Sequence, residues 1–480
     1  MKNFLKFLLV TIICFATAVC LIACEKPTDD DSITPPTSSP VETAVYIDGL
    51  KFDLLDDGNY YLVTVGQNTS NNVVIPDTCN GKSVTEIGLN AFYACKSVVT
   101  VTIPSTIEVI GANAFKNCSN LKSVTFLDNS KLVRLNAIFN GCSNLENIDF
   151  GKNSALDVIE AQTFIGCSRI KSIDLPERLT KIGAKAFYGC SGIESIKIPA
   201  SLTTIETWAF ENCSSLKSIT IASENTTFAV SDNVLFSKNM NTLIKYPSAN
   251  SNTSYSIPAS VTTISDSAFS GAKYLKNIDL SSAPNLASIC NSAFKNCSQI
   301  SQITIPASIT TLEDLAFQDC SLLNSLKFEN GSKLNSIGKF AFSDCRALTE
   351  IDFGNTKNLK IIGQDAFHFC EKLKKVSIPE SVERIESFAF EYCGLETVTF
   401  GENSKLKYIG TNAFTFCENL NNVVIPVSIS KIDLYAFDYC FALTNFSYEG
   451  TIAQWSAVIK GAVWRDSAPF AFVKCLDGNV

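Results

Sequence analysis

A phenylalanine followed three residues later by a cysteine recurs along most of the chain. The segment AFKNCSNLKSVTF (114–126) returns as AFENCSSLKSITI, AFKNCSQISQITI and AFSDCRALTEIDF. There are thirteen such cysteines, and Ala272 takes the same place in SAFSGAKYLKNIDL, which makes fourteen units. Neighbouring positions lie 23 to 25 residues apart, except for one gap of 59 between Cys213 and Ala272. A unit of this length is too short to enclose a hydrophobic core of its own. Successive units must therefore stack and share a common core. The predicted ladder cysteines are Cys95, Cys118, Cys142, Cys167, Cys190, Cys213, Cys297, Cys320, Cys345, Cys370, Cys393, Cys417 and Cys440.

Each unit predicts a short strand, a turn and a second, shorter apolar segment. In LKSVTF and its equivalents the apolar residues alternate at the end of the run, as in a strand with one buried face. Pro or Asn-Gly then ends the strand, because proline cannot donate to a ladder and glycine tolerates the turn. The AFxxC segment closes the unit as a short helical or irregular turn with Phe and Cys directed inward. We therefore expect a β-rich repeat solenoid, an arc of about 14 units of 23–25 residues with short parallel strands.

Three stretches depart from the period: the start, one internal gap and the end. Two alternating runs around Asp57-Gly58 predict a hairpin at the start. The gap has the pattern of a second hairpin, and the end brings in Trp455 and Trp464 as the apolar contents of a closing cap. The predicted parts are an N-terminal β cap (44–90), the repeat solenoid (91–443) with a β-hairpin insert (222–256), and a C-terminal cap (444–480).

Composition limits the partners and the chemistry open to this chain. Apolar residues make up 46% of it and charged residues 18%, which is enough to bury a core. The net charge of −8 and the lack of a basic stripe argue against a nucleic-acid partner, since phosphate binding needs clustered Lys and Arg. One His, two Met and three Trp leave few of the residue types that active sites use. We therefore predict no enzyme, no cofactor and no metal.

The first 43 residues predict export and anchoring. Lys2 and Lys6 precede the apolar run LLVTIICFATAV, which is the layout of a signal peptide over residues 1–23. The ending Leu-Ile-Ala-Cys resembles the bacterial lipobox, which implies a lipid on Cys24; an ordinary signal peptide with an incidental cysteine is the alternative. The Pro-, Ser-, Thr- and Asp-rich residues 24–43 predict a flexible tether. Its early acidic residues resemble the export signals of Bacteroidetes surface lipoproteins, so we expect outer-membrane display, with membrane contact through the lipid only.

The repeat AFxxCxxLxxIxIPxxVxxIG resembles the BspA-like, or Treponema pallidum-type, leucine-rich repeat, unit by unit from about residue 95 to 440. The opening VIPDTCNGKSVTEIG and the Trp-containing end look like the same family. The resemblance implies a secreted or surface-attached leucine-rich-repeat solenoid with an adhesin-like role in holding host proteins or other cells. It carries over no catalytic residue.

The repeated cysteine has four interpretations: disulfides, a metal row, catalysis and packing. Neighbouring strands lie about 4.8 Å apart, which permits a disulfide, but stacked units point their cysteines the same way and Ala272 replaces one of them. A straight row cannot surround a zinc ion, and thirteen equivalent copies are not the pattern of a catalytic nucleophile. We therefore favour packing, with some disulfides as the alternative. Cys79, Cys290 and Cys475 lie off the ladder and could be free or paired.

Residues expected to face water are the better candidates for function. The middle residue of each repeat strand is mostly small and polar, which predicts plain β surface or a broad protein-binding face. His368 stands at a variable position of its turn and is expected to be a surface residue. Aromatics gather in the AFxxC turns of the last units. The candidate binding edge is Phe369, Tyr392, Phe416 and Tyr439, with burial between neighbouring turns as the alternative.

Together these features predict a non-enzymatic cell-surface lipoprotein that binds protein or host-cell ligands through its repeats. A glycan-capturing surface lipoprotein is one alternative, and a structural envelope protein without a specific ligand is another. Binding to protein arrays compared with polysaccharide arrays would separate these possibilities.

Overall fold

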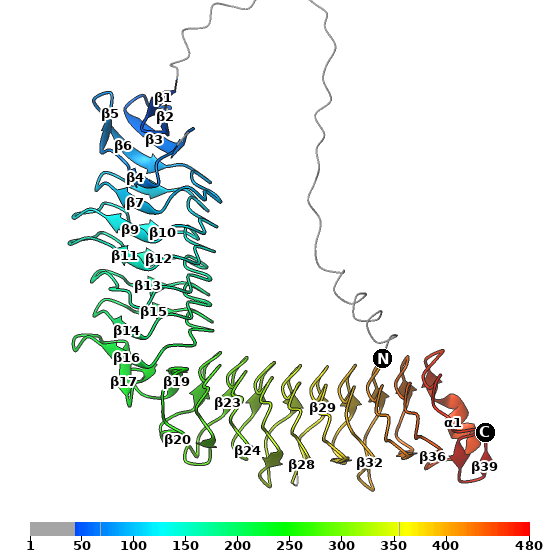
Figure 1. Cartoon of the computed structure of the whole chain (residues 1–480). Coiled ribbons are helices and arrows are strands. Elements are labelled where there is room, and N and C mark those ends of the chain that lie inside the picture. The colour runs from blue at the N-terminus through cyan, green and yellow to red at the C-terminus, as the bar shows by residue number, and fades with distance from the viewer. Residues whose placement is uncertain (1–43, 68, 355) are drawn as a thin grey trace, which may run out of the picture. The chain divides into compact units, whose positions relative to one another are not determined.

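The structure is a computed structural model that describes residues 44–67, 69–354 and 356–480. The chain winds as a β-solenoid, in which each turn lays its strands beside those of the turn before (Figure 1). The predicted repeat solenoid with short parallel strands is therefore confirmed. The described residues contain one short helix, α1 (Ile452–Ala457), and none of their helices is long and apolar enough to cross a membrane.

The longer strand of each turn has one buried face, as its alternating sequence predicts. In β9 (Ser123–Phe126) the buried residues are Val124 and Phe126, and Val124 stands opposite Val101 of the parallel strand β7. Pairing one unit away along the sequence keeps equivalent side chains in register. These strands are β4 (Asn72–Val74), β7 (Thr100–Ile103), β9, β11 (Asn147–Asp149), β14 (Ser195–Ile198), β16 (Ser218–Ile221), β20 (Ser254–Ser256), β22 (Asn277–Asp279), β24 (Gln302–Ile305), β26 (Ser325–Phe328), β28 (Glu350–Asp352), β30 (Lys375–Ile378), β32 (Thr397–Phe400), β34 (Asn422–Ile425) and β36 (Asn445–Tyr448).

A second ladder is built from the short apolar segment that follows each turn. Its strands are mostly two residues long and also pair in parallel, with Ile385 opposite Ile362 and Ile409, for example. The pairing runs without a break from β19 to β37. These strands are β8 (Val109–Ile110), β10 (Arg134–Leu135), β12 (Val158–Ile159), β13 (Lys181–Ile182), β15 (Thr204–Ile205), β19 (Thr242–Lys245), β21 (Thr263–Ile264), β23 (Ser288–Ile289), β25 (Thr311–Leu312), β27 (Ser336–Ile337), β29 (Ile361–Ile362), β31 (Arg384–Ile385), β33 (Tyr408–Ile409), β35 (Lys431–Ile432) and β37 (Ile459–Lys460).

The phenylalanines of the AFxxC turns form the spine of the core. They are buried and stack ring on ring from turn to turn, with centroids 4.7 to 5.6 Å apart. The turns themselves are hydrogen-bonded but contain no helix, so of the two predicted forms the irregular one is present. The stack has two segments, Phe92 to Phe210 and Tyr246 to Phe437. Two clusters of buried residues divide the core at the same place.

The predicted number of fourteen units is too low by at least two turns. Tyr246, inside the insert, takes the place of the core phenylalanine: it is buried, stacks on Phe269 at 5.0 Å and donates its N–H to the carbonyl of Ala268. Near the end of the chain, the carbonyl of Trp464 accepts from Phe437 N, so the period continues into the predicted cap. The motif Tyr-Pro-Ser-Ala in place of Phe-x-x-Cys hid the first of these turns.

Antiparallel strands stand at the start of the solenoid and at the insert. At the start β1 (Val45–Ile47), β2 (Leu50–Leu54) and β3 (Tyr60–Val65) form a meander, and β5 (Thr78–Cys79) pairs with β6 (Lys82–Ile87), which joins β3 to the solenoid. In the insert β17 (Phe228–Ser231), β18 (Val234–Ser237) and β19 form a second meander, so a third strand adds to the predicted hairpin. After β36 come α1, β37, β38 (Lys474–Cys475) and β39 (Gly478–Asn479), with Trp455 and Trp464 against Phe446.

Candidate functional site

The cysteine ladder lies inside the solenoid, and twelve of the thirteen predicted members are buried. Each of the twelve donates its Sγ–H to the carbonyl oxygen of the core aromatic residue one turn earlier, as Cys320 does to Phe294 at 3.3 Å. Cys95, on the first rung, is half-buried and contacts the Ser97 hydroxyl instead. The packing interpretation did not include this bond, in which a small buried side chain also satisfies a backbone acceptor.

The chemistry of these thiols is that of buried side chains. All described cysteines are free, including Cys79, Cys290 and Cys475. Burial raises the pKa of Cys213 and of Cys297 to about 12, so the reactive thiolate is disfavoured there. The predicted lipid attachment site at Cys24, with the signal peptide and tether, lies outside the described residues.

The residue directly before each ladder position has a left-handed backbone, with φ between 54° and 78°. Asn, Asp and above all Gly adopt this conformation most readily. Nine of the earlier ladder turns use these residue types: Asn117, Gly141, Gly166, Gly189, Asn212, Gly271, Asn296, Asp319 and Asp344. The next four turns hold Phe369, Tyr392, Phe416 and Tyr439 instead. A bulky side chain in this region costs about 1–2 kcal/mol, so the turn itself does not account for the change.

These four residues, named here the aromatic edge, form one stacked column. Phe369 lies 4.7 Å from Tyr392 between ring centroids, Tyr392 lies 4.4 Å from Phe416, and Phe416 lies 4.4 Å from Tyr439. The last two pairs are within 6° of parallel. Both ends of the column have a neighbour: the Arg346 guanidinium lies 5.2 Å from the Phe369 ring centroid, and the Phe441 and Tyr439 rings meet nearly at right angles.

The aromatic edge is partly exposed, which combines the two predicted possibilities. Tyr392 is 36% exposed and Tyr439 is 39% exposed, whereas Phe369 and Phe416 are half-buried between their neighbours. Because neighbouring rings cover each other's faces, the column presents ring edges and two tyrosine hydroxyls to solvent. A sugar or a nucleobase stacks on an open ring face, so this geometry is better suited to a protein surface.

A second left-handed position, two residues before the core phenylalanine, carries further aromatics in this part of the chain. Phe340, Phe388 and Tyr435 occupy it, with φ between 55° and 62°. Tyr435 is also exposed. The turns that follow residue 338 are therefore rich in aromatic side chains at both strained positions.

Beside the aromatic edge, His368 pairs with a carboxylate. Its Nε2 lies 3.0 Å from Oε2 of Glu391, and both side chains are largely buried. The expectation of a tolerated surface residue is therefore wrong, because Glu391 on the next turn gives the imidazole a partner. Together with Asp365, whose pKa is raised by burial, these side chains bring potential metal-ligand atoms within 4.8 Å of one another. A divalent cation could bind there only in competition with the existing His–Glu contact.

A second group of ligand-type side chains joins Asp266, Cys290 and Glu313. The backbone N–H of Asn291 donates to both carboxylates, and the Asn291 amide donates to Glu313 at 2.7 Å. Burial raises the pKa of Asp266, of Glu313 and, to about 12, of Cys290. Both carboxylates therefore accept hydrogen bonds from Asn291, which links them without a metal ion.

The outward row of the longer strands is polar and carries no aromatic residue. Lys197, Lys327 and Asp352 are exposed members of it, and Val424 is its apolar exception. This row therefore has the character of plain β surface, in contrast to the aromatic edge.

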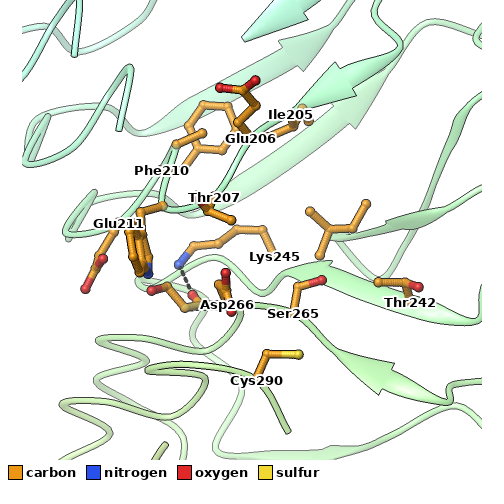
Figure 2. A pocket seen from close by; sticks show the side chains of 14 residues that line it. Ile205, Glu206, Thr207, Phe210, Glu211, Thr242, Lys245, Ser265, Asp266 and Cys290 are labelled. Atoms are coloured by element: carbon orange, nitrogen blue, oxygen red, sulfur yellow. Dashed lines mark hydrogen bonds between the residues drawn. The ribbon is translucent and has the colours of Figure 1, made fainter. Parts of the chain in front are cut away.

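A cavity that the sequence did not predict lies beside the insert (Figure 2). It has a volume of about 340 Å³ and is lined by segments 205–211 and 265–267, by Thr242, Ile244 and Lys245, and by Cys290. Lys245 extends across its middle (Figure 2). A signal for it exists in the sequence, because this lysine stands where most other turns have the alanine of the Ala-Phe pair.

Comparison with known proteins places the repeat in a described family. Four overlapping stretches, residues 66–156, 136–252, 245–358 and 335–458, match the BspA type leucine-rich repeat region of six copies. Together they cover residues 66–458, well over half of the chain. No curated protein matches the sequence.

Several solved structures have the same fold. A leucine-rich cell surface protein from Faecalibacterium prausnitzii A2-165 is 25% identical, with a TM-score of 0.50 over 88% of this chain and 98% of that one. A leucine-rich repeat protein from Eubacterium ventriosum is 22% identical, with a TM-score of 0.54 over 77% and 93% of the two chains. The pneumococcal vaccine antigen PcpA is 19% identical, with a TM-score of 0.50 over 92% and 100%. The last two similarities concern the fold alone.

Proposed function

The chain belongs to the BspA type leucine-rich repeat family, and from that membership we propose that it is a cell-surface binding protein without chemistry of its own. Its contact surface for a protein partner is the aromatic edge. Membership supports a repeat-based binding role, and the similar Faecalibacterium protein is itself described as a cell surface protein. The partner is a protein or host-cell surface component.

One observation carries the choice of surface. Four consecutive turns place Phe or Tyr at a backbone position that nine earlier turns fill with Gly, Asn or Asp. Strained conformations that persist in a structure concentrate at functional sites. Aromatic side chains at partly exposed positions are also the residues that dominate protein interfaces. The aromatic edge therefore has a feature that folding of the turn does not require.

The covered ring faces support a protein partner over a glycan. A carbohydrate site of this kind would leave at least one ring face open, whereas stacking covers the faces inside the column, and Arg346 and Phe441 contact its two ends. Ring edges and the hydroxyls of Tyr392 and Tyr439 remain available to contact apolar and hydrogen-bonding groups of a protein. Glycan capture and a purely structural role remain as outcomes of the test.

The test compares the wild-type chain with a quadruple variant, F369N/Y392N/F416N/Y439N, on arrays of matrix and host-surface proteins and on polysaccharide and mucin arrays. Asparagine is native to the same position in other turns, so the variant keeps the fold. We expect saturable binding of the wild type to a protein and at least tenfold weaker binding of the variant. Tyr274→Asn, which removes an exposed tyrosine elsewhere, should bind like the wild type.

Three outcomes would contradict this proposal. Undiminished binding by the quadruple variant would exclude the aromatic edge as the contact surface. Binding confined to polysaccharides would favour glycan capture, and the lack of any saturable ligand would favour a structural role.

We also propose that the protein reaches the outer-membrane surface through a lipid on Cys24. Lys2 and Lys6, the apolar run and the Leu-Ile-Ala-Cys ending support this. Cys24→Ser should move the protein from the membrane fraction to the soluble fraction and remove the lipid mass from its N-terminal peptide. Membrane retention of Cys24→Ser would contradict the anchor, and protease treatment of intact cells would test the direction of display.

A further inference from the structure

A buried lysine interrupts the row of small residues that precede the core aromatics. Most turns have alanine there, as at Ala268 and Ala293, but the turn of Tyr246 has Lys245. Lys245 is 4% exposed, and its Nζ donates to the carbonyl of Ser267 at 2.9 Å. It forms no ion pair with any described residue. An ammonium group has three donors, so two of them are left for a ligand.

Backbone hydrogen bonding between turns lapses at the same place. In the other turns the N–H of the core aromatic residue donates to a carbonyl of the next turn, as from Phe187 to Ala209 and from Phe269 to Ala293. The N–H of Phe210 has no acceptor among the described residues, and neither does that of Trp208. Phe210 is buried, so water outside the protein does not readily replace the missing acceptor.

The cavity of Figure 2 occupies this interruption. Trp208 and Phe210 line it from the first core segment, and Lys245 and Ser267 line it from the second. Ser267 is 2% exposed, and its hydroxyl has no hydrogen-bond partner among the residues that the structure describes. Ile205, Ala209 and Ile244 supply apolar wall. The cavity therefore combines a buried cation and unused donors with an apolar surface.

An acidic side chain without a partner lies on the same wall. Glu211 lines the cavity, is buried, and has no side-chain hydrogen bond or ion pair with a described residue. The other acids there are engaged: Glu206 pairs with Lys181 at 2.7 Å, and Asp266 accepts from Asn291 N. Lys245 and Glu211 thus line one cavity close enough to interact electrostatically, but no ion-pair contact or hydrogen bond joins their side chains in the described part of the chain.

We propose that this cavity binds a small apolar α-amino acid in its free form. Its carboxylate would accept from Lys245 Nζ, the Phe210 N–H and the Ser267 hydroxyl, and its ammonium group would face Glu211. Its side chain would lie against Trp208 and Ile244. Such a ligand satisfies the buried cation, the buried anion and the unused donors together, because each of them is costly to leave without a partner. This site is separate from the aromatic edge and from the protein partner proposed there.

The test uses three matched probes and the full chain. L-Phenylalanine carries both charges, 3-phenylpropionate lacks only the ammonium group, and phenethylamine lacks only the carboxylate. We expect titration calorimetry or saturation-transfer NMR to show saturable binding of L-phenylalanine, at least tenfold tighter than of either analogue. Lys245→Met should weaken L-phenylalanine binding at least tenfold, and Glu211→Gln should make L-phenylalanine and 3-phenylpropionate bind alike. Lys217→Met, which removes an exposed lysine, should bind like the wild type.

Three results would overturn the proposal. One is the lack of saturable binding of L-phenylalanine to the wild type up to 10 mM, roughly the weakest affinity that a built site of this kind would have. Another is equal binding of all three probes, and the third is unchanged binding by Lys245→Met. Circular dichroism of each variant, compared with the wild type, separates lost binding from lost folding. A Phe-terminated dipeptide, in which the peptide bond removes one of the two charges of the Phe residue, should bind more weakly than free L-phenylalanine.

Discussion

The position before the ladder cysteine shows how a single residue can report on function. Its left-handed backbone is set by the turn, so the choice of side chain has a known cost in the folded state. Asn and Gly lower that cost, and stacking among the aromatic residues of the last four turns offsets most of it. The two contributions nearly cancel, so stability does not select the aromatic side chains.

Substitutions at Tyr392 should separate the backbone cost from the stacking gain. Tyr392→Asn relieves about 1 kcal/mol of strain and loses stacking worth about 1 kcal/mol, so the free energy of unfolding should change little. Tyr392→Val loses the stacking and places a β-branched side chain in the left-handed region, so it should cost about 2 kcal/mol more than the Asn variant. Urea unfolding followed by circular dichroism measures both. Equal stability of the two variants would mean that strain at φ 56° is not what the aromatic residue overcomes.

The ladder cysteine has the opposite character, because its role is satisfied inside the fold. Its thiol fills a small buried space and donates to a Phe carbonyl, and Ala272 shows that a turn forms without it. The twelve buried cysteines are therefore explained by packing and hydrogen bonding within the turns. The departures from the repeat, at Phe369 or Lys245, are the residues whose presence the turn does not explain.

At the scale of elements, the regular part of each unit could be predicted from sequence. Alternation in SVTF identifies β9, and the Phe-x-x-Cys spacing identifies the turn that carries the core stack. These patterns are local and repeat, so one correct unit predicts the rest. The turn of Tyr246 was not predicted, because its sequence lacks the Phe and Cys that define the motif. Tyr246 and Ala249 are nevertheless buried, like the Phe and Cys of the other turns.

The candidate sites were less predictable from the sequence than the repeat, because they depend on contacts between turns. The alignment of Phe369, Tyr392, Phe416 and Tyr439 follows from the period, so the sequence could propose the aromatic edge. The sign of φ and the covered ring faces depend on backbone geometry that the pattern does not contain. The pairing of His368 with Glu391 and the lapse of hydrogen bonds at Phe210 depend on how one turn meets the next, which a motif read within a single unit does not describe.

At the scale of the whole described body, the insert divides one solenoid into two buried cores. The first core includes Phe139 and ends at the insert, and the second includes Phe317 and begins there. Strand β18 serves both, because Leu235 belongs to the first cluster and its neighbours Val234 and Phe236 belong to the second. In repeat proteins stability is a sum of turn and interface contributions, so a weak interface allows the parts to unfold separately.

We therefore expect chemical unfolding of this protein to occur in two transitions. Phe139→Ala and Phe317→Ala each remove a stacked, fully buried ring and should each cost about 3–5 kcal/mol. Phe139→Ala should lower the midpoint of one transition and Phe317→Ala that of the other, because each ring belongs to a different core. Urea titration monitored by hydrogen exchange with mass spectrometry assigns each transition to its peptides. A single transition that both variants shift equally would mean that the insert couples the two cores into one cooperative unit, since β18 would then transmit the loss of either ring to the whole ladder.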